Sequence, residues 1–106
     1  MKVRSLVVAE DDARSAAEYL ESERTGLRQR FFQEFRRVVA NIRRFPQMYA
    51  LVDDNIPGHE IRNAILERLK FRIVYFVAPT EVVIVAVDHT SRRPGHWHQR
   101  LNETPT

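Results

Sequence analysis

Basic side chains stand within or directly after the apolar runs in the second half of the sequence. Arg62 and Arg72 each interrupt such a run, and the run Val82–Val87 is followed by His89 and Arg92. Metal-free cleavage of RNA needs a base for the attacking 2′-hydroxyl, cations for the phosphorane and an acid for the leaving oxygen. His89 is a candidate acid or base, because imidazole titrates near neutral pH. Arg62, Arg72 and Arg92 are candidate catalytic cations of the same site.

Each of these candidates also has a structural interpretation. An arginine inside an apolar run must reach a rim, a partner or a ligand, because an unpaired buried charge is very costly. Arg62 and Arg72 can therefore pair with acidic residues such as Glu60 and Asp88 across the sheet. His89 can be a hydrogen-bonding residue at a strand end. The residue types alone leave both interpretations open.

Two residues beyond these runs are candidates for contact with a target or a nucleic acid. Arg93 can bind a phosphate, and Trp97 can offer an indole face on which a base stacks. Trp97 can equally be a packing anchor for the C-terminal segment. His96 and His98 point away from each other on a helix and lack an accompanying carboxylate cluster, so we expect no metal site. No glycine-rich phosphate loop is present in the sequence, and we expect no cofactor.

The length and composition of the chain limit which classes of protein it can belong to. The chain has 106 residues, no cysteine and a formal net charge of +3. This length predicts one domain, residues 1–106, and the lack of cysteine excludes disulfides, zinc ribbons and thiol catalysis. All but two of the 17 basic residues are arginines, which suits an acidic or polyanionic partner, although a codon bias toward arginine explains the same composition. No segment has the length of a signal peptide or a membrane span, so we expect a cytoplasmic protein.

The elements that must position these residues begin with a strand and two helices. Residues 2–8 alternate loosely as a strand does, and Asp11 or Asp12 is a candidate helix N-cap. A second, longer helix is predicted over residues 27–44, where Phe45-Pro46 ends it. The first helix should present one small-residue face, made of Ala13, Ala16, Ala17 and Leu20.

Three strands are then predicted at residues 60–66, 71–77 and 82–87. The third consists almost entirely of Val, Ile and Ala, which is typical of a central strand buried on both faces. A hairpin turn is expected at residues 78–81, and Pro94 is a candidate start of a short terminal helix. The order β-αα-βββ predicts the α+β class, with an antiparallel sheet covered on one face by a helical hairpin.

Taken in order, these segments resemble the RelE/ParE superfamily of toxins from bacterial type II toxin–antitoxin modules, and in particular its ParE-like, plasmid stabilisation branch. The resemblance covers nearly the whole chain. It rests on an ordered set of short motifs: Ala13 and Tyr19 in the first helix, Gly26 with Phe32 and Glu34, Phe45-Pro46, Ile61-Arg62, Phe71-Arg72-Ile73-Val74-Tyr75, Ala86-Val87-Asp88-His89, and Arg92-Arg93-Pro94 with Trp97.

The resemblance implies a growth-inhibiting toxin that a cognate antitoxin neutralises. RelE-like members enter the ribosomal A site and cut mRNA without a metal, whereas ParE-like members poison DNA gyrase and have no nuclease site. The nucleases of this family carry several basic residues and a Tyr or His near the C-terminus. Here lysine is almost absent, and Trp97 is the only aromatic residue after His89. We therefore favour gyrase inhibition, with ribosome-dependent mRNA cleavage and a fold without toxicity as the alternatives.

The second predicted helix carries an arginine-rich flank outside its apolar stripe. An antitoxin usually wraps its toxin with a segment that folds on binding, and an acidic segment would suit such a flank. Solubility alone explains the same charges, and the sequence does not indicate how many copies associate. The candidate antitoxin-binding residues are Arg36, Arg37, Arg43 and Arg44.

Overall fold

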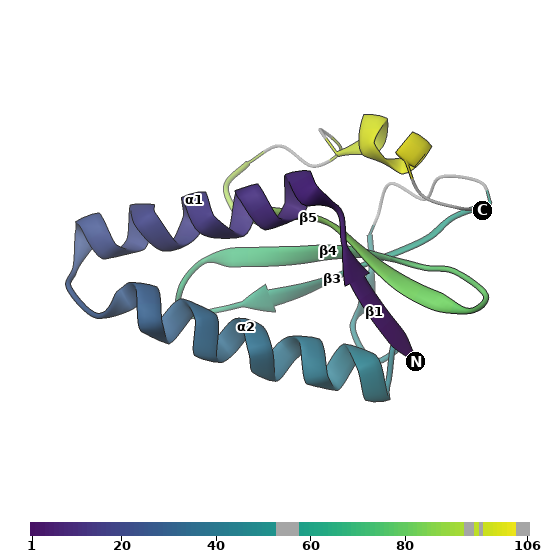
Figure 1. Cartoon of the computed structure of the whole chain (residues 1–106), viewed down its shortest axis with the longest axis horizontal. Helices are drawn as coiled ribbons and strands as arrows, with labels where there is room; N and C mark the ends of the chain where they lie inside the picture. Colours follow the sequence, from purple (N-terminus) through teal and green to yellow (C-terminus); the bar gives the residue numbers. More distant parts are fainter. Residues whose placement is uncertain (53–57, 93–94, 96, 104–106) are drawn as a thin grey trace.

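The structure, a computed structural model, describes residues 1–52, 58–92, 95 and 97–103. The strands among these residues form one sheet in the order β1-β5-β4-β3-β2. The α+β arrangement predicted from the sequence is confirmed, with β2 as an additional short strand (Figure 1). The elements are β1 (Lys2–Ser5), α1 (Val7–Glu23), α2 (Leu27–Arg44), β2 (Ala50–Leu51), β3 (Glu60–Leu66), β4 (Phe71–Val77), β5 (Glu81–His89) and a 3-10 helix (His98–Glu103).

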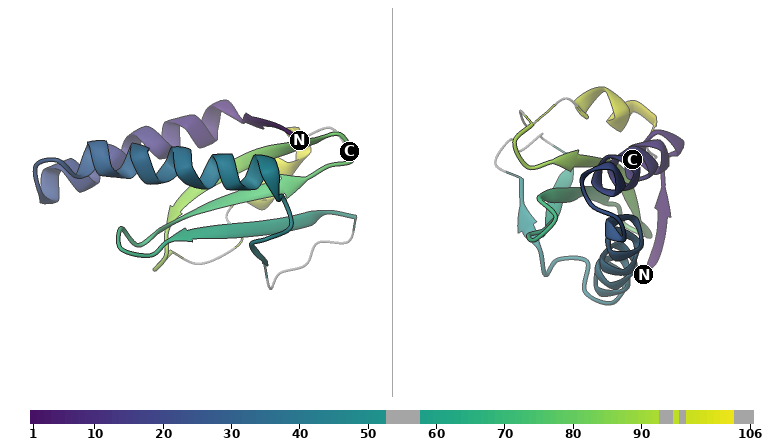
Figure 2. Two further views of the ribbon diagram at one scale, coloured as in Figure 1. Left: turned by 90° about the horizontal axis from the view of Figure 1, so that it is seen from below. Right: turned by 90° about the vertical axis from the view of Figure 1, so that its left-hand side faces the viewer.

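The two helices form one layer and the sheet forms the other (Figure 2). The hydrophobic core lies between the layers, where α2 contributes Phe31, Val38 and Ile42, each at most 1% exposed. β5 is buried from Val82 to Asp88, as we expected for a strand in the interior of the sheet. The small-residue face of α1 is also confirmed, because the residues buried along it include Ala13, Ala16, Ala17 and Leu20.

β1 pairs with β5 in parallel, so the sheet is mixed and not wholly antiparallel as we expected. Lys2 lies opposite Glu81, and Ser5 lies opposite Ile84. The helical hairpin carries the chain across one face of the sheet after β1, which allows the parallel pairing. β3, β4 and β5 then follow as antiparallel neighbours. β1 covers the first part of the edge that β5 would otherwise expose.

β1 covers only the first half of β5, and side chains satisfy the rest of that edge. The Asp12 carboxylate accepts a hydrogen bond from the backbone N–H of Val87 at 3.1 Å. Arg100, in the 3-10 helix, donates to the carbonyl of Val85 at 2.9 Å and to Asp12 at 2.6 Å. Backbone groups at a buried edge need such partners, so these contacts hold α1 and the C-terminal segment against β5.

This use of Asp12 corrects the predicted start of the first helix. α1 begins at Val7, and Leu6 before it makes no side-chain capping bond. Asp12 lies in the second turn, and the N-cap prediction is wrong because its carboxylate is bonded to a distant strand. The preceding strand is correspondingly shorter than predicted and ends at Ser5.

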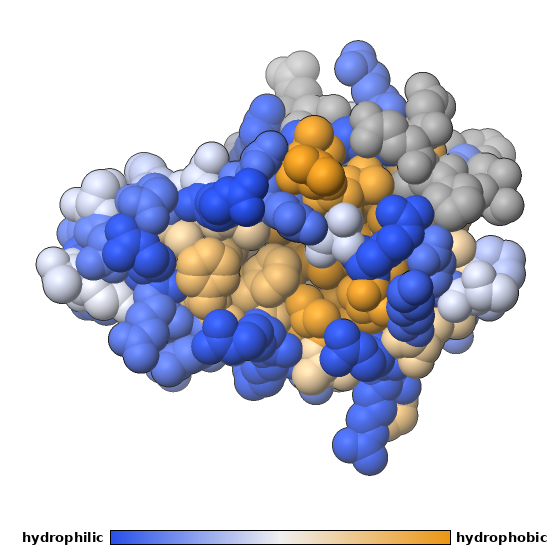
Figure 3. Space-filling view, in the orientation of Figure 1, coloured by the Kyte–Doolittle hydropathy of each residue, from blue (hydrophilic) through white to orange (hydrophobic). Residues whose placement is uncertain are grey.

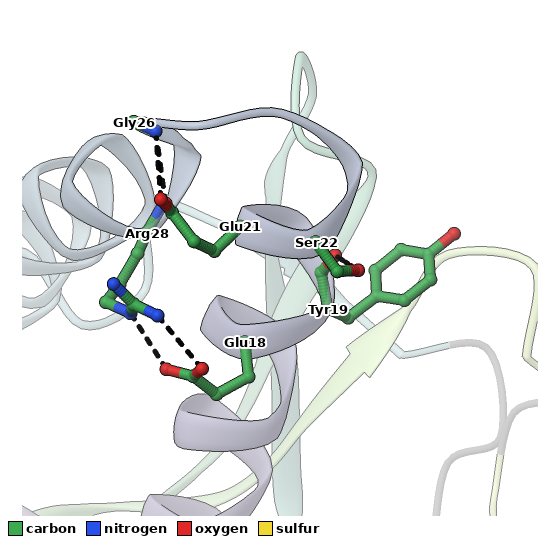
Figure 4. Close-up of polar contacts among 6 residues, drawn as sticks. All are labelled: Glu18, Tyr19, Glu21, Ser22, Gly26 and Arg28. Atoms are coloured by element: carbon green, nitrogen blue, oxygen red, sulfur yellow. Dashed lines mark hydrogen bonds and ion pairs between the residues drawn. The ribbon is translucent and has the colours of Figure 1, made fainter.

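The turn between α1 and α2 is held by two acidic side chains (Figure 4). Gly26 has a φ of 98°, in the left-handed region that favours glycine. The Glu21 carboxylate accepts hydrogen bonds from the backbone N–H groups of Gly26 at 3.1 Å and of Arg28 at 3.0 Å. The Arg28 guanidinium donates to Glu18 at 2.8 and 2.9 Å. These hydrogen bonds lower the pKa of both carboxyl groups.

Candidate functional site

Arg62 is used by the fold itself. Its Nε donates to Glu60 at 2.8 Å, and its Nη1 donates to the carbonyls of Gln47 at 3.2 Å and Tyr49 at 2.7 Å. The Arg62 side chain is only 15% exposed. The structure therefore supports the interpretation in which Arg62 pairs with an acid, here on its own strand, and it fastens the segment after α2 to β3.

Arg72 lies on the opposite face of the sheet from Arg62. In the regular β3–β4 register, Arg62 pairs with Tyr75, and Arg72 lies three residues before Tyr75 on β4. Because side chains alternate between faces along a strand, the two guanidinium groups cannot converge. The Arg72 Nη2 donates to the carbonyl of Thr90 at 2.6 Å, while its buried Nε has no hydrogen-bond partner among the described residues.

His89 and Arg92 lie together at the end of β5. His89 pairs with Phe71 in the sheet, and their rings meet edge to face at 5.2 Å. The His89 Nδ1 accepts a hydrogen bond from the backbone N–H of Ser91 at 3.1 Å, as expected for a hydrogen-bonding residue at a strand end. Arg92 is exposed and lines a hollow of about 210 Å³ with His89.

The four candidate catalytic residues therefore do not form one site. Arg72 pairs with Asp88 in the sheet and His89 pairs with Phe71, so neighbouring positions place Arg72 and His89 on opposite faces. Glu60, the acid that pairs with Arg62, lies six residue pairs away from His89 along the sheet, or about 20 Å at the rise of a strand. Only His89 and Arg92 remain together, without the other two cations.

Trp97 is 1% exposed and packs in the hydrophobic core. Its indole therefore offers no open face to a base, which corrects the stacking interpretation and supports the packing anchor. Directly after it, the 3-10 helix carries Arg100 to β5. Arg93, Pro94 and His96 lie outside the described residues, so the structure does not bear on their predicted roles.

All four arginines of the predicted antitoxin-binding flank are exposed, and they divide between two sides of α2. Arg36 and Arg43 are seven residues apart, as are Arg37 and Arg44, so each pair shares a side of the helix. Arg37 forms a salt bridge with Glu34 at 2.7 Å, and the guanidinium carbon of Arg44 lies 5.5 Å from the centre of the Phe45 ring. Arg36 and Arg43 form no side-chain hydrogen bond or salt bridge with any described residue.

A band of apolar residues lies between the two helices on the outer face of the molecule (Figure 3). Phe32, Phe35 and Val39 of α2 are partly buried against the core, and their spacing places them on one stripe of the helix. Arg36 follows Phe32 by four residues, and Arg43 follows Val39 by four residues, so both arginines border this stripe. The helical face thus offers an apolar surface with cations at its margin.

Four basic side chains that sequence analysis did not single out line a hollow at the tip of the helical hairpin. They come from the turn after α1, from α2 and from the β3–β4 turn, so no local sequence pattern joins them. One signal was available, since Lys70 is one of only two lysines and directly precedes a strand. The four residues are Arg24, Arg30, Arg68 and Lys70.

The sequence matches the family described as ParE toxin of type II toxin-antitoxin system, parDE, over residues 6–94. Because the match spans most of the chain, the protein belongs to this family. It is the toxin component of a type II toxin–antitoxin module, whose partner is a cognate antitoxin.

Among solved structures, a chain titled "Chromosomal ParDE TA system from P. aeruginosa" superposes with a TM-score of 0.61 at 18% identity, covering 86% of this chain and 97% of that one. This likeness supports the RelE/ParE-like fold. A comparison with curated proteins finds no match. In the described part of the chain, no helix is long and apolar enough to cross a membrane, and no group of three His, Cys, Asp or Glu is placed to hold a metal.

Proposed function

We propose that this toxin acts by inhibiting DNA gyrase and does so without a catalytic step of its own. Its membership of the ParE family is the observation that carries the proposal. The separation of Arg62 from Arg72 and His89 supports it, because charge stabilisation in a nuclease needs its cations around one phosphate. A gyrase target also implies that the toxin works in the cytoplasm.

The antitoxin is proposed to dock on the outer face of the helical hairpin. Partly exposed apolar residues that form a continuous surface commonly mark a protein interface, and Phe32, Phe35 and Val39 provide such a stripe. An amphipathic antitoxin segment would place its apolar side on this stripe and acidic residues against Arg36 and Arg43. Arg37 and Arg44 lie on the far side of α2 and should contribute less.

Induced expression of the toxin, followed by two assays on the same protein, tests the proposed target. The purified chain should block supercoiling by gyrase and should leave mRNA in a translating extract uncut. The folded Arg72→Ala variant should inhibit gyrase at the same concentration as the wild type. A nuclease would instead give in-frame mRNA cuts, and Arg72→Ala would reduce them by about a hundredfold or more. That second pattern would refute the gyrase proposal.

A further inference from the structure

The tip of the helical hairpin and the β3–β4 turn lie at the same end of the molecule (Figures 1 and 2). A hollow of about 490 Å³ lies between them, bordered by Arg24, Arg30, Arg68 and Lys70. Its floor includes the apolar side chains of Leu20 and Leu69. Arg24 and Arg30 lie far in the sequence from Arg68 and Lys70, and only the fold brings the two pairs together.

The cations around this hollow lack the acidic partners that six other arginines have. No described residue forms a side-chain hydrogen bond or a salt bridge with Arg24, Arg30, Arg68 or Lys70. Six arginines elsewhere in the fold are paired with acidic side chains, namely Arg4, Arg14, Arg28, Arg37, Arg62 and Arg100. Unpaired like charges around one hollow repel each other, and an anionic ligand would relieve that repulsion.

Two carboxylates lie near the hollow, and both are already engaged. Glu23 is the only acid among the described residues that line it, and it accepts a hydrogen bond from the Tyr19 hydroxyl at 2.8 Å. Glu34 lies close by, and its pKa is lowered by the hydrogen bond from Arg37, with smaller contributions from the charges of Arg30 and Arg68. The hollow therefore keeps a surplus of positive charge.

Lys70 has a strained backbone conformation. Lys70 has a φ of 59°, and it is the only non-glycine residue with a positive φ in the described part of the chain. Its N–H donates to the carbonyl of Leu66 at 2.8 Å, and its carbonyl accepts from the N–H of Thr90 at 2.9 Å. Glycine would adopt this conformation with less strain, so the presence of a lysine here points to use of its charge.

An aromatic ring stands beside the cations. Tyr19 lines the hollow and is 51% exposed. It projects from α1 on the side away from Glu18 and Arg28 (Figure 4), and it meets the Phe71 ring edge to face at 6.4 Å. A fixed, exposed aromatic ring next to several cations is the combination that binds nucleic acid strands, because bases stack on the ring while phosphates meet the cations.

We propose that this hollow binds a strand of nucleic acid, with Arg24, Arg30, Arg68 and Lys70 around its phosphates and Tyr19 available to a base. An acidic protein segment would match the charge but would make no particular use of the exposed ring. Arg30 and Arg37 are seven residues apart and share a side of α2, whereas Arg36 and Arg43 border the other side. The hollow and the proposed antitoxin surface therefore lie on different sides of the helix. The inference does not depend on which cellular target the toxin inhibits.

Fluorescence anisotropy with the full-length chain and a labelled single-stranded DNA oligonucleotide tests this inference. Affinity should fall as salt rises, and each lost phosphate contact should reduce the slope of log K against log salt by about 0.7. Lys70→Gly removes the charge and also relieves the backbone strain, so it should weaken binding without lowering the melting temperature. Arg68→Gln should also weaken binding, and it replaces Lys70→Gly as the test variant if Lys70→Gly fails to fold. Tyr19→Ala should weaken binding with little change in the salt slope.

Lys2→Gln is the matched control, because it removes one exposed positive charge from β1, at a distance from the hollow. It should bind the oligonucleotide as the wild type does. Equal weakening by Lys2→Gln and by the hollow variants would show a general charge effect and overturn the proposal. So would unchanged binding by folded Lys70→Gly and Arg68→Gln. Displacement of the oligonucleotide by a poly-glutamate peptide of equal charge, at equal affinity, would also overturn it, in favour of an acidic protein segment.

Discussion

The arginines of the sheet and those of the hairpin tip differ in what the fold uses them for. Arg62 and Arg72 of the sheet, and Arg100 of the 3-10 helix beside β5, donate to backbone carbonyls, and Arg62 and Arg100 also meet a carboxylate. Arg30 and Arg68, at the tip, are exposed and have no salt bridge with any described residue. An arginine inside an apolar run is therefore explained by the backbone it satisfies. A surface arginine without a partner remains available for a ligand.

This difference bears directly on the nuclease interpretation. A guanidinium that stabilises a phosphorane must be free to meet the phosphate, whereas Arg62 is bonded on three sides and only 15% exposed. The residues that looked catalytic in the sequence are in large part structural. Four of the charges that the structure leaves without a partner among the described residues lie at the other end of β3, beside the helical hairpin.

The largest expected effect concerns Trp97, the buried anchor of the C-terminal segment. Trp97→Ala should lower the free energy of unfolding by about 3–5 kcal/mol, because it empties a buried site for a large ring. Denaturation in urea measures this change. A direct role in target binding would instead leave stability unchanged while reducing activity, and that result would contradict the packing role.

The next effect separates the two groups of arginines. Arg62→Ala should cost about 2 kcal/mol, because it leaves the carbonyls of Gln47 and Tyr49 and the Glu60 carboxylate without their donor. Arg68→Ala, at the tip, should change stability by less than about 0.5 kcal/mol. Urea denaturation of both variants under the same conditions makes the comparison. Equal losses would show that the tip arginines are structural as well.

A third test concerns the antitoxin surface. Reversing the charge of Arg36 and Arg43 together should weaken binding of the cognate antitoxin by about tenfold or more, because both cations border the apolar stripe. The matched reversal of Arg37 and Arg44, on the other side of α2, should have a clearly smaller effect. Titration calorimetry with the antitoxin measures both. The opposite ranking would place the antitoxin on the side of α2 that faces β3.

The smallest effect is the pH dependence of the hairpin turn. The pKa of the Glu21 carboxyl is lowered from its ordinary value of 4.5 by hydrogen bonds from the backbone of Arg28 and Gly26. The ionised carboxylate therefore stabilises the turn at pH values above 4.5, and this stabilisation is lost as the pH falls through the lowered pKa of the folded state. Glu21→Gln should therefore melt slightly below the wild type at neutral pH and close to it at about pH 3. A melting difference that is the same at both pH values would contradict this account.

The sequence predicted correctly those elements whose ends are determined by neighbouring residues. α2 begins after Gly26, which takes a left-handed φ, and ends at Phe45-Pro46, so its predicted bounds match the structure. The spacing of buried residues likewise fixed the sheet-facing side of α1. In contrast, Asp12 was misread as a cap because its partner, Val87, is 75 residues away in the sequence. A carboxylate near a helix start carries no local sign of a distant partner.

The candidate site was harder to predict for the same reason. The residue types at the strand ends suggested a site, but the face of the sheet that each side chain occupies depends on the register of the strands. Arg72 pairs with Asp88, the residue before His89, and this offset of one residue places Arg72 and His89 on opposite faces. The hollow at the tip combines residues of α1, α2 and β5 with residues of two separate turns. Only the packing of the helical hairpin over the β3–β4 turn brings them together.

The concentration of toxin that halves gyrase supercoiling, measured for the wild type and for folded Arg72→Ala, tests the central claim that the sheet arginines are structural and the toxin is not a nuclease. The account predicts that both proteins inhibit supercoiling at the same concentration of folded chain. Failure of the wild type to inhibit gyrase, together with mRNA cleavage that disappears in Arg72→Ala, would contradict it.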